Sequence, residues 1–242
     1  MAVEKSADEA LEKTRAIRAM FGAIAPTYDT LNRLLSFGVD AGWRKKMVAR
    51  LPEGRALRVL DLACGTGDVA IEIVRSRPQA VVFGGDITLP MIVAGLPKVK
   101  KHRMEDAITF QALSAEELPY RDGYFDAVTI AFGIRNVVRR ETALREMARV
   151  LKPGGTALIL DFSMPPNPLV RAFYGFYFHR VLPLMGGLVS GNFEAYRYLP
   201  RSVEGFPPRE VFAKMMIDAG FTGVTYTDFT FGVATLYQGG KE

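Results

Sequence analysis

Short apolar runs alternate with helical repeats over most of the chain. The apolar runs, typical of strands that are buried on both faces, span residues 56–63, 80–85, 108–112, 125–132 and 156–162. Segments with helical spacing lie between them, at residues 68–76, 90–101 and 141–151. The helix-breaking sequence Lys152-Pro153-Gly154-Gly155 follows the last of these segments. This alternation predicts an α/β fold with a parallel, doubly wound sheet.

The N-terminal part of the chain has a different pattern. Residues 5–20 and 39–50 are predicted helices, and residues 21–35 are predicted as a loop that enters another helix. None of these segments contains a strand-like apolar run. We therefore expect a helical cap over residues 1–50, placed before the α/β domain.

The C-terminal part completes the predicted sheet. An aromatic-rich stretch at about residues 164–206 interrupts the alternation and reads as an insertion within the domain formed by residues 51–242. A helix at 209–219 then precedes two β-rich stretches, 223–229 and 233–238, which favour an antiparallel hairpin at the sheet edge. The fold expected is a mostly parallel, seven-stranded, Rossmann-like sheet with helices on both faces.

Composition narrows the class of protein. The chain has 242 residues with one cysteine, Cys64, and two distant histidines, His102 and His179, so neither an intrachain disulfide nor a zinc cluster is expected. The net charge of +5 is dispersed, without the basic run of a nucleic-acid surface. The best membrane-span candidate, Val181–Val189, is short and contains Pro183. We expect a cytoplasmic protein that is at most peripheral to a membrane.

The first strand runs into a glycine loop with two interpretations. Gly65-x-Gly67-x-x-Ala70 satisfies the dinucleotide fingerprint, and Asp86 follows Gly67 at the distance of a ribose-binding acid. A NAD-dependent reductase is therefore one alternative. Asp61 favours another, because a carboxylate at the strand end would repel a pyrophosphate and attract the ammonium and sulfonium of S-adenosylmethionine.

The next two strands end in residues that suit the rest of such a cofactor. Asp86 follows the second strand, and its two oxygens can accept both ribose hydroxyls. Ser114-Ala115 follows the third strand, where a hydroxyl and a backbone amide can read the edge of an adenine. Carboxyl ends of parallel strands meet at one edge of the sheet, so these residues predict a single nucleotide site.

Five segments together give the chain a resemblance to a known family. They are FGxIAxxYDxLN at residues 21–32, VLDLACGTGD at 59–68, GGDI at 84–87, FGIRN at 132–136 and YRYLPxS at 196–202. They resemble class I S-adenosylmethionine-dependent methyltransferases and, more narrowly, the ubiquinone/menaquinone biosynthesis C-methyltransferases of the UbiE/MenG family. The resemblance extends from about residue 15 to residue 240.

The resemblance implies an activity and a cofactor. It implies transfer of a methyl group from S-adenosylmethionine, which becomes S-adenosylhomocysteine, to a ring carbon of a polyprenylated quinol. Demethylmenaquinol is favoured, while a benzoquinol of the ubiquinone pathway and another small phenol stay open. The resemblance implies cofactor contacts at Thr66, Asp86, Ser114, Ala115 and the backbone of Ala131. We expect the same site to include Tyr28, Asp61, Gly65, Gly67 and Ile87.

The FGIRN segment carries the implied chemistry. Arg135 is expected to stabilise a quinolate and Asn136 to orient the hydroxyl or a water, because arginine is too weak an acid to serve as a base. Asp29 and Asp161 are the candidate carboxylates for accepting the ring proton, and His179 is a less favoured one. The structural alternative for Arg135 is a helix cap or an ion pair with an acid at a strand end.

The aromatic insertion suggests where the lipid tail would lie. At helical spacing Phe173, Phe176 and Tyr177 fall on one side, either as core residues or as an apolar wall for an isoprenoid chain. The partner expected is thus a lipid quinol, with peripheral membrane contact and no nucleic acid. The oligomeric state stays open, a homodimer being one option.

Overall fold

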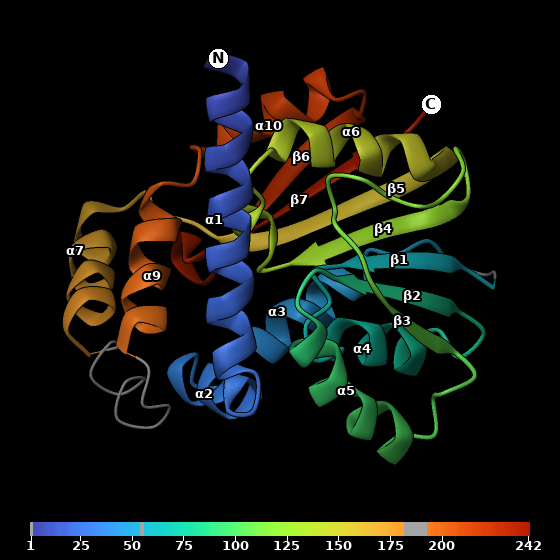
Figure 1. Cartoon of the computed structure of the whole chain (residues 1–242), viewed down its shortest axis with the longest axis horizontal. Coiled ribbons are helices and arrows are strands. Elements are labelled where there is room, and N and C mark those ends of the chain that lie inside the picture. Colours follow the sequence, from blue (N-terminus) through green and yellow to red (C-terminus); the bar gives the residue numbers. More distant parts are fainter. Residues whose placement is uncertain (1, 54–55, 182–192) are drawn as a thin grey trace.

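The computed structural model describes residues 2–53, 56–181 and 193–242. Its strands form one seven-stranded sheet in the order β3-β2-β1-β4-β5-β7-β6 (Figure 1). The strands are β1 (Arg58–Leu62), β2 (Val81–Asp86), β3 (Ile108–Ala112), β4 (Phe125–Ala131), β5 (Leu151–Phe162), β6 (Thr222–Phe229) and β7 (Ala234–Gly240).

Helices precede, connect and follow these strands. The α-helices are α1 (Ala2–Ile24), α2 (Tyr28–Leu35), α3 (Val39–Val48), α4 (Asp68–Ser76), α5 (Leu89–Lys101), α6 (Arg140–Val150), α7 (Pro168–Phe176), α9 (Phe193–Glu204) and α10 (Arg209–Asp218). Shorter helical turns are η1 (Ile134–Asn136), η2 (Tyr177–Val181) and η3 (Thr230–Gly232).

The predicted sheet topology is confirmed. β1 to β5 are parallel, and β7 pairs antiparallel with both β5 and β6, which makes the C-terminal hairpin at the edge. β1 lies between β2 and β4, so the strand order reverses next to it. In sheets of this kind the crevice at that reversal, beyond the carboxyl ends of the strands, is where ligands bind.

Two apolar cores cover the two faces of the sheet. Because side chains alternate along a strand, Val59 of β1 contributes to one core and the next residue, Leu60, to the other. The first core includes Trp43 of α3 and side chains of α4, and the second includes Phe212 of α10 and side chains of α6. Helices therefore cover both faces, as the sequence predicts (Figure 1).

A third apolar cluster joins the N-terminal helices to the aromatic insertion. Ile24 and Leu31, from α1 and α2, pack with Tyr174 of α7, Phe178 of η2 and Val203 of α9. In Figure 1 these helices lie together beside the ends of β4 and β5, with α1 crossing in front of the sheet. They form a wall at the edge where the parallel strands end.

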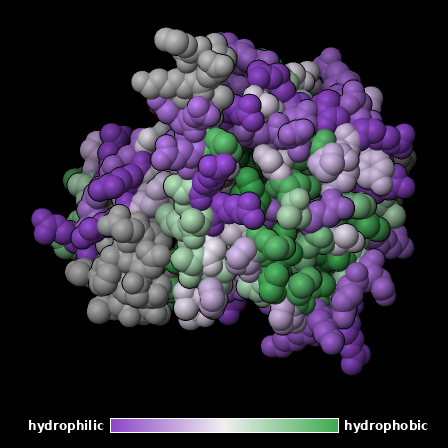
Figure 2. Space-filling model, viewed as in Figure 1, coloured by the Kyte–Doolittle hydropathy of each residue, from purple (hydrophilic) through white to green (hydrophobic). Residues whose placement is uncertain are grey.

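Apolar side chains are also exposed outside that wall. Figure 2, in the view of Figure 1, shows them over the region of α5, whose Leu89, Val93 and Leu96 are exposed. Exposed apolar patches of this kind are frequent where proteins contact other proteins or membranes. No helix among the described residues is long and apolar enough to cross a membrane.

Three local expectations differ from the structure in detail. The helix expected after a loop within residues 21–35 is present as α2, but the loop is only a short turn, because α1 extends to Ile24 and α2 begins at Tyr28. The break expected at residues 152–155 ends α6, but β5 already begins at Leu151. There the Gly154 amide donates to the Lys241 carbonyl (2.7 Å), so pairing with the segment that follows β7 extends β5 through the glycines.

The third difference concerns the aromatic face. Phe173 and Phe176 are exposed, which excludes the core role for these two rings, and the buried rings are Tyr174 and Phe178. α7 continues into a wider π-type turn, so helical spacing no longer decides which rings share a side beyond Phe176. Residues 182–192 of the insertion, including nearly all of the apolar stretch 181–189, lie outside the described residues.

Candidate functional site

Two cavities meet at the carboxyl edge of the parallel strands, beside β1 and β4. Their volumes are about 440 and 110 Å³. The residues common to both are Phe21, Tyr28, Ala63, Gly65, Ala131 and Phe132. Every predicted cofactor contact except Gly67 lines one cavity or both, as do Asp29, Arg135 and Asn136, whereas Asp161 and His179 line neither. The fold therefore brings together residues that the sequence spreads over more than a hundred positions.

Asp61, at the end of β1, is a buried carboxylate with one oxygen left unpaired. Its side chain lines the larger cavity, and the residue is 1% exposed. Oδ1 accepts a hydrogen bond from Thr129 Oγ1 (2.7 Å), whereas Oδ2 has no partner among the described residues. Burial raises the pKa of Asp61 to about 7. A buried, unpaired carboxylate oxygen is costly, and a cationic ligand group would satisfy it.

The glycine loop turns sharply and ties the ends of β1 and β2 together. Gly65 and Gly67 have φ values of 55° and 84°, a region that favours glycine. The Gly65 amide donates to Asp86 Oδ2 (2.9 Å), and the Thr88 amide donates to Asp86 Oδ1 (2.7 Å). A side chain on Gly67 would come within 2.6 Å of the Phe110 ring, so Gly67 permits close packing behind the loop.

The smaller cavity lies against the ends of β2 and β3. Asp86 and Ile87 form one side, and Ser114 and Ala115 form another. Asp86 is buried, which raises its pKa, and each of its oxygens keeps a second lone pair for a ligand. A carboxylate facing two small residues suits a ribose and a flat heterocycle, as the sequence predicts.

Strained backbone lies where the two cavities meet. Ala63 and Phe132, which follow β1 and β4, have φ values of 47° and 59°, rare for residues with a side chain. Gly133 allows these two turns to approach, because a Cβ on it would overlap the side chain of Ala63. Such strain persists only where the surrounding structure enforces it, and it is frequent at ligand sites.

Arg135 is fixed by an ion pair at the wall of the larger cavity. Nη1 donates to Asp161 Oδ1 (2.7 Å) and to the Phe132 carbonyl, and the backbone amide donates to Asp161 Oδ2 (3.0 Å). Burial would lower the pKa of Arg135, but Asp161 outweighs it and the net pKa is raised. The guanidinium is thus permanently charged. The ion pair with a strand-end acid, one of the sequence alternatives, is present, and Arg135 also reaches the cavity.

Two segments that are distant in sequence contact each other beside Arg135. Tyr198 Oη donates to Asn136 Oδ1 (3.0 Å), and Arg135 Nε donates to Ser202 Oγ (3.3 Å). The FGIRN segment after β4 is therefore held by the YRYLPxS segment of α9. Because Tyr198 occupies Asn136 Oδ1, the amide N–H groups of Asn136 are left to donate to a ligand at the smaller cavity that Asn136 lines.

The helix α2 places Tyr28 and Asp29 over the glycine loop. Tyr28 is half-buried, and this burial raises its pKa; it borders both cavities. Asp29 Oδ1 accepts a hydrogen bond from Thr66 Oγ1 (2.5 Å), and Asp29 Oδ2 pairs with Lys98 Nζ (2.6 Å). Lys98 also contacts Asp68. The loop is thus tied to both α2 and α5.

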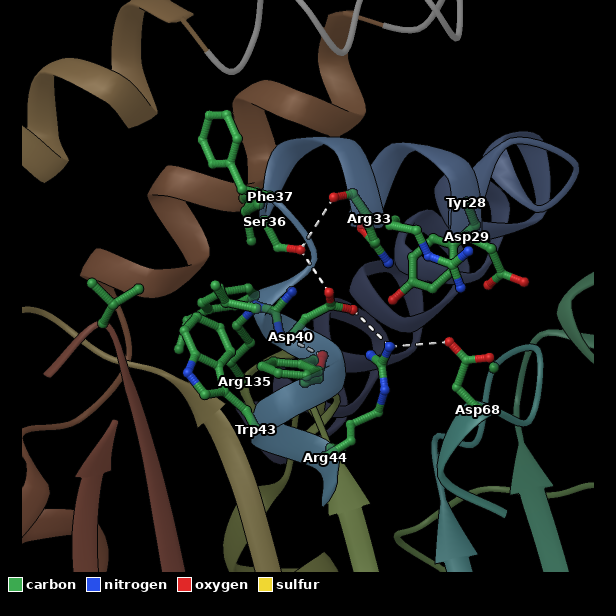
Figure 3. A pocket seen from close by; sticks show the side chains of 18 of the residues that line it. Tyr28, Asp29, Arg33, Ser36, Phe37, Asp40, Trp43, Arg44, Asp68 and Arg135 are labelled. Atoms are coloured by element: carbon green, nitrogen blue, oxygen red, sulfur yellow. Dashed lines mark hydrogen bonds and ion pairs between the residues drawn. The ribbon is translucent and has the colours of Figure 1, made fainter. Parts of the chain in front are cut away.

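Further charged residues at this wall were missed by the sequence reasoning. Arg44 Nη2 pairs with Asp40 Oδ2 (2.7 Å) and with Asp68 Oδ2 (3.2 Å), and Ser36 Oγ donates to Asp40 Oδ1 (2.6 Å). Figure 3 shows this chain of contacts along one side of the larger cavity. The Ser36–Asp40 and Asp40–Arg44 contacts each span four residues, but only the second lies within one helix and is a local signal in the sequence. The contact of Arg44 with Asp68 joins two separate helices.

The opposite part of the larger cavity is aromatic. The rings of Trp43, Phe132 and Phe162 pack together, with centroids 4.8–6.2 Å apart. Phe173 and Tyr177 extend this wall, whereas Phe176 does not line the cavity. His179 pairs with Glu204 (2.7 Å), is half exposed and lies outside the lining of both cavities.

Comparison with known sequences identifies relatives over nearly the whole chain. The family model described as "ubiE/COQ5 methyltransferase family" matches residues 8–241. A "Ubiquinone/menaquinone biosynthesis C-methyltransferase UbiE" of Geobacter sp. (strain M21) is 52% identical over 95% of this chain and 98% of its own. A "Demethylmenaquinone methyltransferase" of Thermus thermophilus is 49% identical over 92% of this chain and 100% of its own.

Solved structures share the fold at low sequence identity. The [4+2]-cyclase SpnF superposes with a TM-score of 0.65 and 15% identity, over 83% of this chain and 80% of its own. Phosphoethanolamine N-methyltransferase 2 of Haemonchus contortus, in complex with S-adenosyl-L-methionine, gives 0.62 and 15%, over 83% of this chain and 52% of its own. These likenesses establish the class I, Rossmann-like fold, which serves more than one kind of reaction.

Proposed function

The chain belongs to the ubiE/COQ5 methyltransferase family, and we propose that it transfers a methyl group from S-adenosylmethionine to a ring carbon of a polyprenylated quinol. Relatives named for menaquinone alone and relatives named for both quinones match it almost equally well. Methylation of demethylmenaquinol is the activity these names share. It is therefore the reaction that we assign first, with the benzoquinol of ubiquinone synthesis second.

One feature supports this cofactor above a dinucleotide. Asp61 leaves a buried carboxylate oxygen unpaired at the glycine loop, where it would repel a pyrophosphate and attract an ammonium group. We assign Asp86 and Ile87 to the ribose, Ser114 and Ala115 to the adenine, and the glycine loop with Tyr28 to the methionyl part. When bound, the cofactor supplies a methyl group on a sulfonium, which is a strong electrophile.

Arg135 and Asn136 activate the acceptor in this proposal. A ring carbon becomes nucleophilic when the neighbouring hydroxyl ionises, and a fixed cation nearby lowers the pKa of that hydroxyl. Arg135 is such a cation, held in the cavity wall by Asp161. Asn136 lines the smaller cavity and its carbonyl is occupied by Tyr198, so we assign its N–H donors to a water or to a quinol oxygen where the two cavities meet.

Two carboxylates, Asp29 and Asp161, are the candidates for accepting the ring proton. Asp161 is fully buried and bonded to Arg135 through both oxygens, so it cannot reach a substrate. Asp29 also contacts Thr66 and Lys98, but it lines the larger cavity and its side chain is 34% exposed, so of the two carboxylates it is the one that we propose for the ring proton.

The lipid tail is assigned to the aromatic part of the larger cavity. Phe37, Phe173 and Phe231 line this cavity and yet are 78%, 76% and 81% exposed, so they stand at its mouth. Phe37 and Phe231 also have left-handed backbone conformations, which cost free energy. We infer that these three rings contact the surface of a lipid bilayer while the tail enters. The residues of the N-terminal cap and of the insertion thus form the substrate side.

A direct assay tests the reaction. The purified protein is incubated with S-adenosylmethionine carrying a labelled methyl group and with demethylmenaquinone or a demethyl benzoquinone, each reduced or oxidised. We expect label on the ring of the reduced naphthoquinol and none on the oxidised quinone, detected by mass spectrometry. Protection from thermal unfolding by NADH, and not by S-adenosylhomocysteine, would contradict the proposal.

The role of Arg135 needs a control for folding. Arg135→Ala should abolish methyl transfer while S-adenosylhomocysteine still binds, but it leaves Asp161 buried without its partner. The double variant Arg135→Met/Asp161→Asn removes both charges together. It should fold, bind S-adenosylhomocysteine and remain inactive; turnover near the wild-type level would remove Arg135 from the mechanism.

Membrane contact has its own test. Replacing Phe37, Phe173 and Phe231 together with serine should reduce co-sedimentation with phosphatidylglycerol vesicles. The rate at which the variant methylates a short-tailed, detergent-dispersed quinol should stay within about threefold of the wild-type rate. The reason is that exposed apolar residues contribute to lipid binding rather than to the stability of the fold. A control variant with Leu89 and Val93 of α5 replaced by serine should still sediment.

A further inference from the structure

Arg44 is a buried cation at the cofactor end of the larger cavity to which the proposed reaction gives no role. It extends from α3 toward the point where the glycine loop enters α4, and its side chain is 15% exposed. Asp61, Gly65 and Thr66 line the same cavity. Figure 3 shows the guanidinium between Asp40 and Asp68.

The methionyl part of the proposed cofactor is a zwitterion, with an ammonium and a carboxylate on one carbon. Asp61 offers an anion for the ammonium, so a matching cation is needed within a few ångströms of it. The arginines and lysines that line the larger cavity in the described part of the chain are Arg33, Arg44 and Arg135. These three are the candidates for the carboxylate.

Two of the three fit poorly. Arg135 is already engaged with Asp161, the Phe132 carbonyl and Ser202. Arg33 is exposed on α2, where water and salt screen its charge. The charge of Arg44, in contrast, lowers the otherwise raised pKa of Asp61, which places the two groups in one local field.

We propose that Arg44 binds the carboxylate of the methionyl group, opposite Asp61, an inference that rests on the proposed use of S-adenosylmethionine. A guanidinium has five N–H donors, and among the described residues the partners of Arg44 are all on Nη2. Nε and Nη1 are free to form a two-pronged contact with a carboxylate. The first-turn amides of α4, which begins at Asp68, add to the attraction.

The existing contacts of Arg44 allow such binding without stranding a charge. Asp40 holds the guanidinium at 2.7 Å and is itself held by Ser36. The contact with Asp68 is longer, 3.2 Å, and Asp68 has a second cationic partner in Lys98. If the guanidinium turns toward a ligand, Asp68 therefore remains paired. The alternative role is a brace between α3 and α4 that never touches the ligand.

Two ligands that differ by one carboxylate distinguish these roles. Binding of S-adenosylhomocysteine and of its decarboxylated analogue, 5′-(3-aminopropylthio)-5′-deoxyadenosine, is measured by isothermal titration calorimetry on the full chain. Arg44→Met should raise the Kd of S-adenosylhomocysteine about 30-fold, which is the effect of losing one charged contact. The Kd of the analogue should change less than about threefold. Arg44→Lys should recover part of the loss, and Arg33→Met should change neither Kd.

The outcomes separate the inference from the function beneath it. Equal weakening of both ligands by Arg44→Met would identify a brace, and unchanged Kd values would also overturn the proposal. If Arg44→Met unfolds, the double variant Asp40→Asn/Arg44→Met, which removes the buried pair together, is titrated instead. Wild-type protein that binds neither ligand would refute the proposed cofactor rather than the role of Arg44.

Discussion

Two buried aspartates, each at or near the end of a strand, divide the site into regions of opposite character. Asp61 of β1 keeps one oxygen without a hydrogen-bond partner in the described part of the chain, and its burial raises its pKa to about 7. Asp161 of β5 is just as buried, but both of its oxygens accept hydrogen bonds from Arg135. The first carboxylate is left for a ligand, and the second is neutralised within the protein.

The difference teaches how one pocket handles two ligands. In the proposed function, the cofactor side holds a carboxylate that a small zwitterion can satisfy, so we expect binding there to be strongly electrostatic. On the substrate side the charge is satisfied in advance, and a rigid cation faces an otherwise aromatic wall. A lipid quinol can bind against this wall without the desolvation of an unpaired charge.

The largest effect is expected from breaking the satisfied pair. Asp161→Ala leaves Arg135 buried without its partner, so the free energy of unfolding should fall by about 3–5 kcal/mol, measured by urea denaturation. Asp218→Ala is the matched control, because Asp218 pairs with Lys214 on the surface and should cost below about 1 kcal/mol. Similar losses in both variants would show that the buried pair is not special.

The unpaired aspartate should behave in the opposite way. Because its pKa is raised from 3.8 to about 7, the folded state binds more protons than the unfolded state in this interval, and stability falls as the pH rises through it. Asp61→Asn removes this cost and should stabilise the ligand-free protein by about 2 kcal/mol at pH 8. It should also lower the affinity for S-adenosylhomocysteine at least about 100-fold. A variant that is less stable than the wild type and still binds the ligand would contradict this prediction.

The same aspartate predicts a pH dependence for binding. The ammonium of the ligand needs an ionised Asp61, whose pKa is about 7 in the free protein. The affinity for S-adenosylhomocysteine should therefore fall about tenfold per pH unit below pH 7. The Asp61→Asn variant should lack this slope in calorimetric titrations from pH 5 to 8. A wild-type affinity that does not change over that range would contradict an unpaired Asp61.

The smallest effect is expected where one hydrogen bond positions the substrate side. Tyr198→Phe removes the contact with Asn136 Oδ1 and should lower kcat less than about tenfold, the value of a single neutral hydrogen bond. The Kd of S-adenosylhomocysteine should not change, because Tyr198 does not line the smaller cavity, to which we assign the ribose and the adenine. A change in that Kd with kcat intact would move Tyr198 to the cofactor side.

The sequence alone determined the sheet and the cofactor edge. Apolar runs fix strands locally, and the carboxyl ends of parallel strands must share an edge, so Asp61, Asp86 and Ser114 were placed together without coordinates. Helix faces in the insertion were predicted less well, because the π-type turn after Phe176 breaks the helical period.

Only the tertiary structure decided which charges are satisfied. The partners of Arg135 and Asn136 lie 26 and 62 residues away in the chain, and Arg44 meets Asp68 only where α3 packs on α4. Such pairings depend on how separate helices pack around the sheet, which residue periodicity does not encode. The sequence thus identified the glycine loop and its carboxylates. The folded chain determined that Asp61 remains open to a ligand and that Asp161 does not.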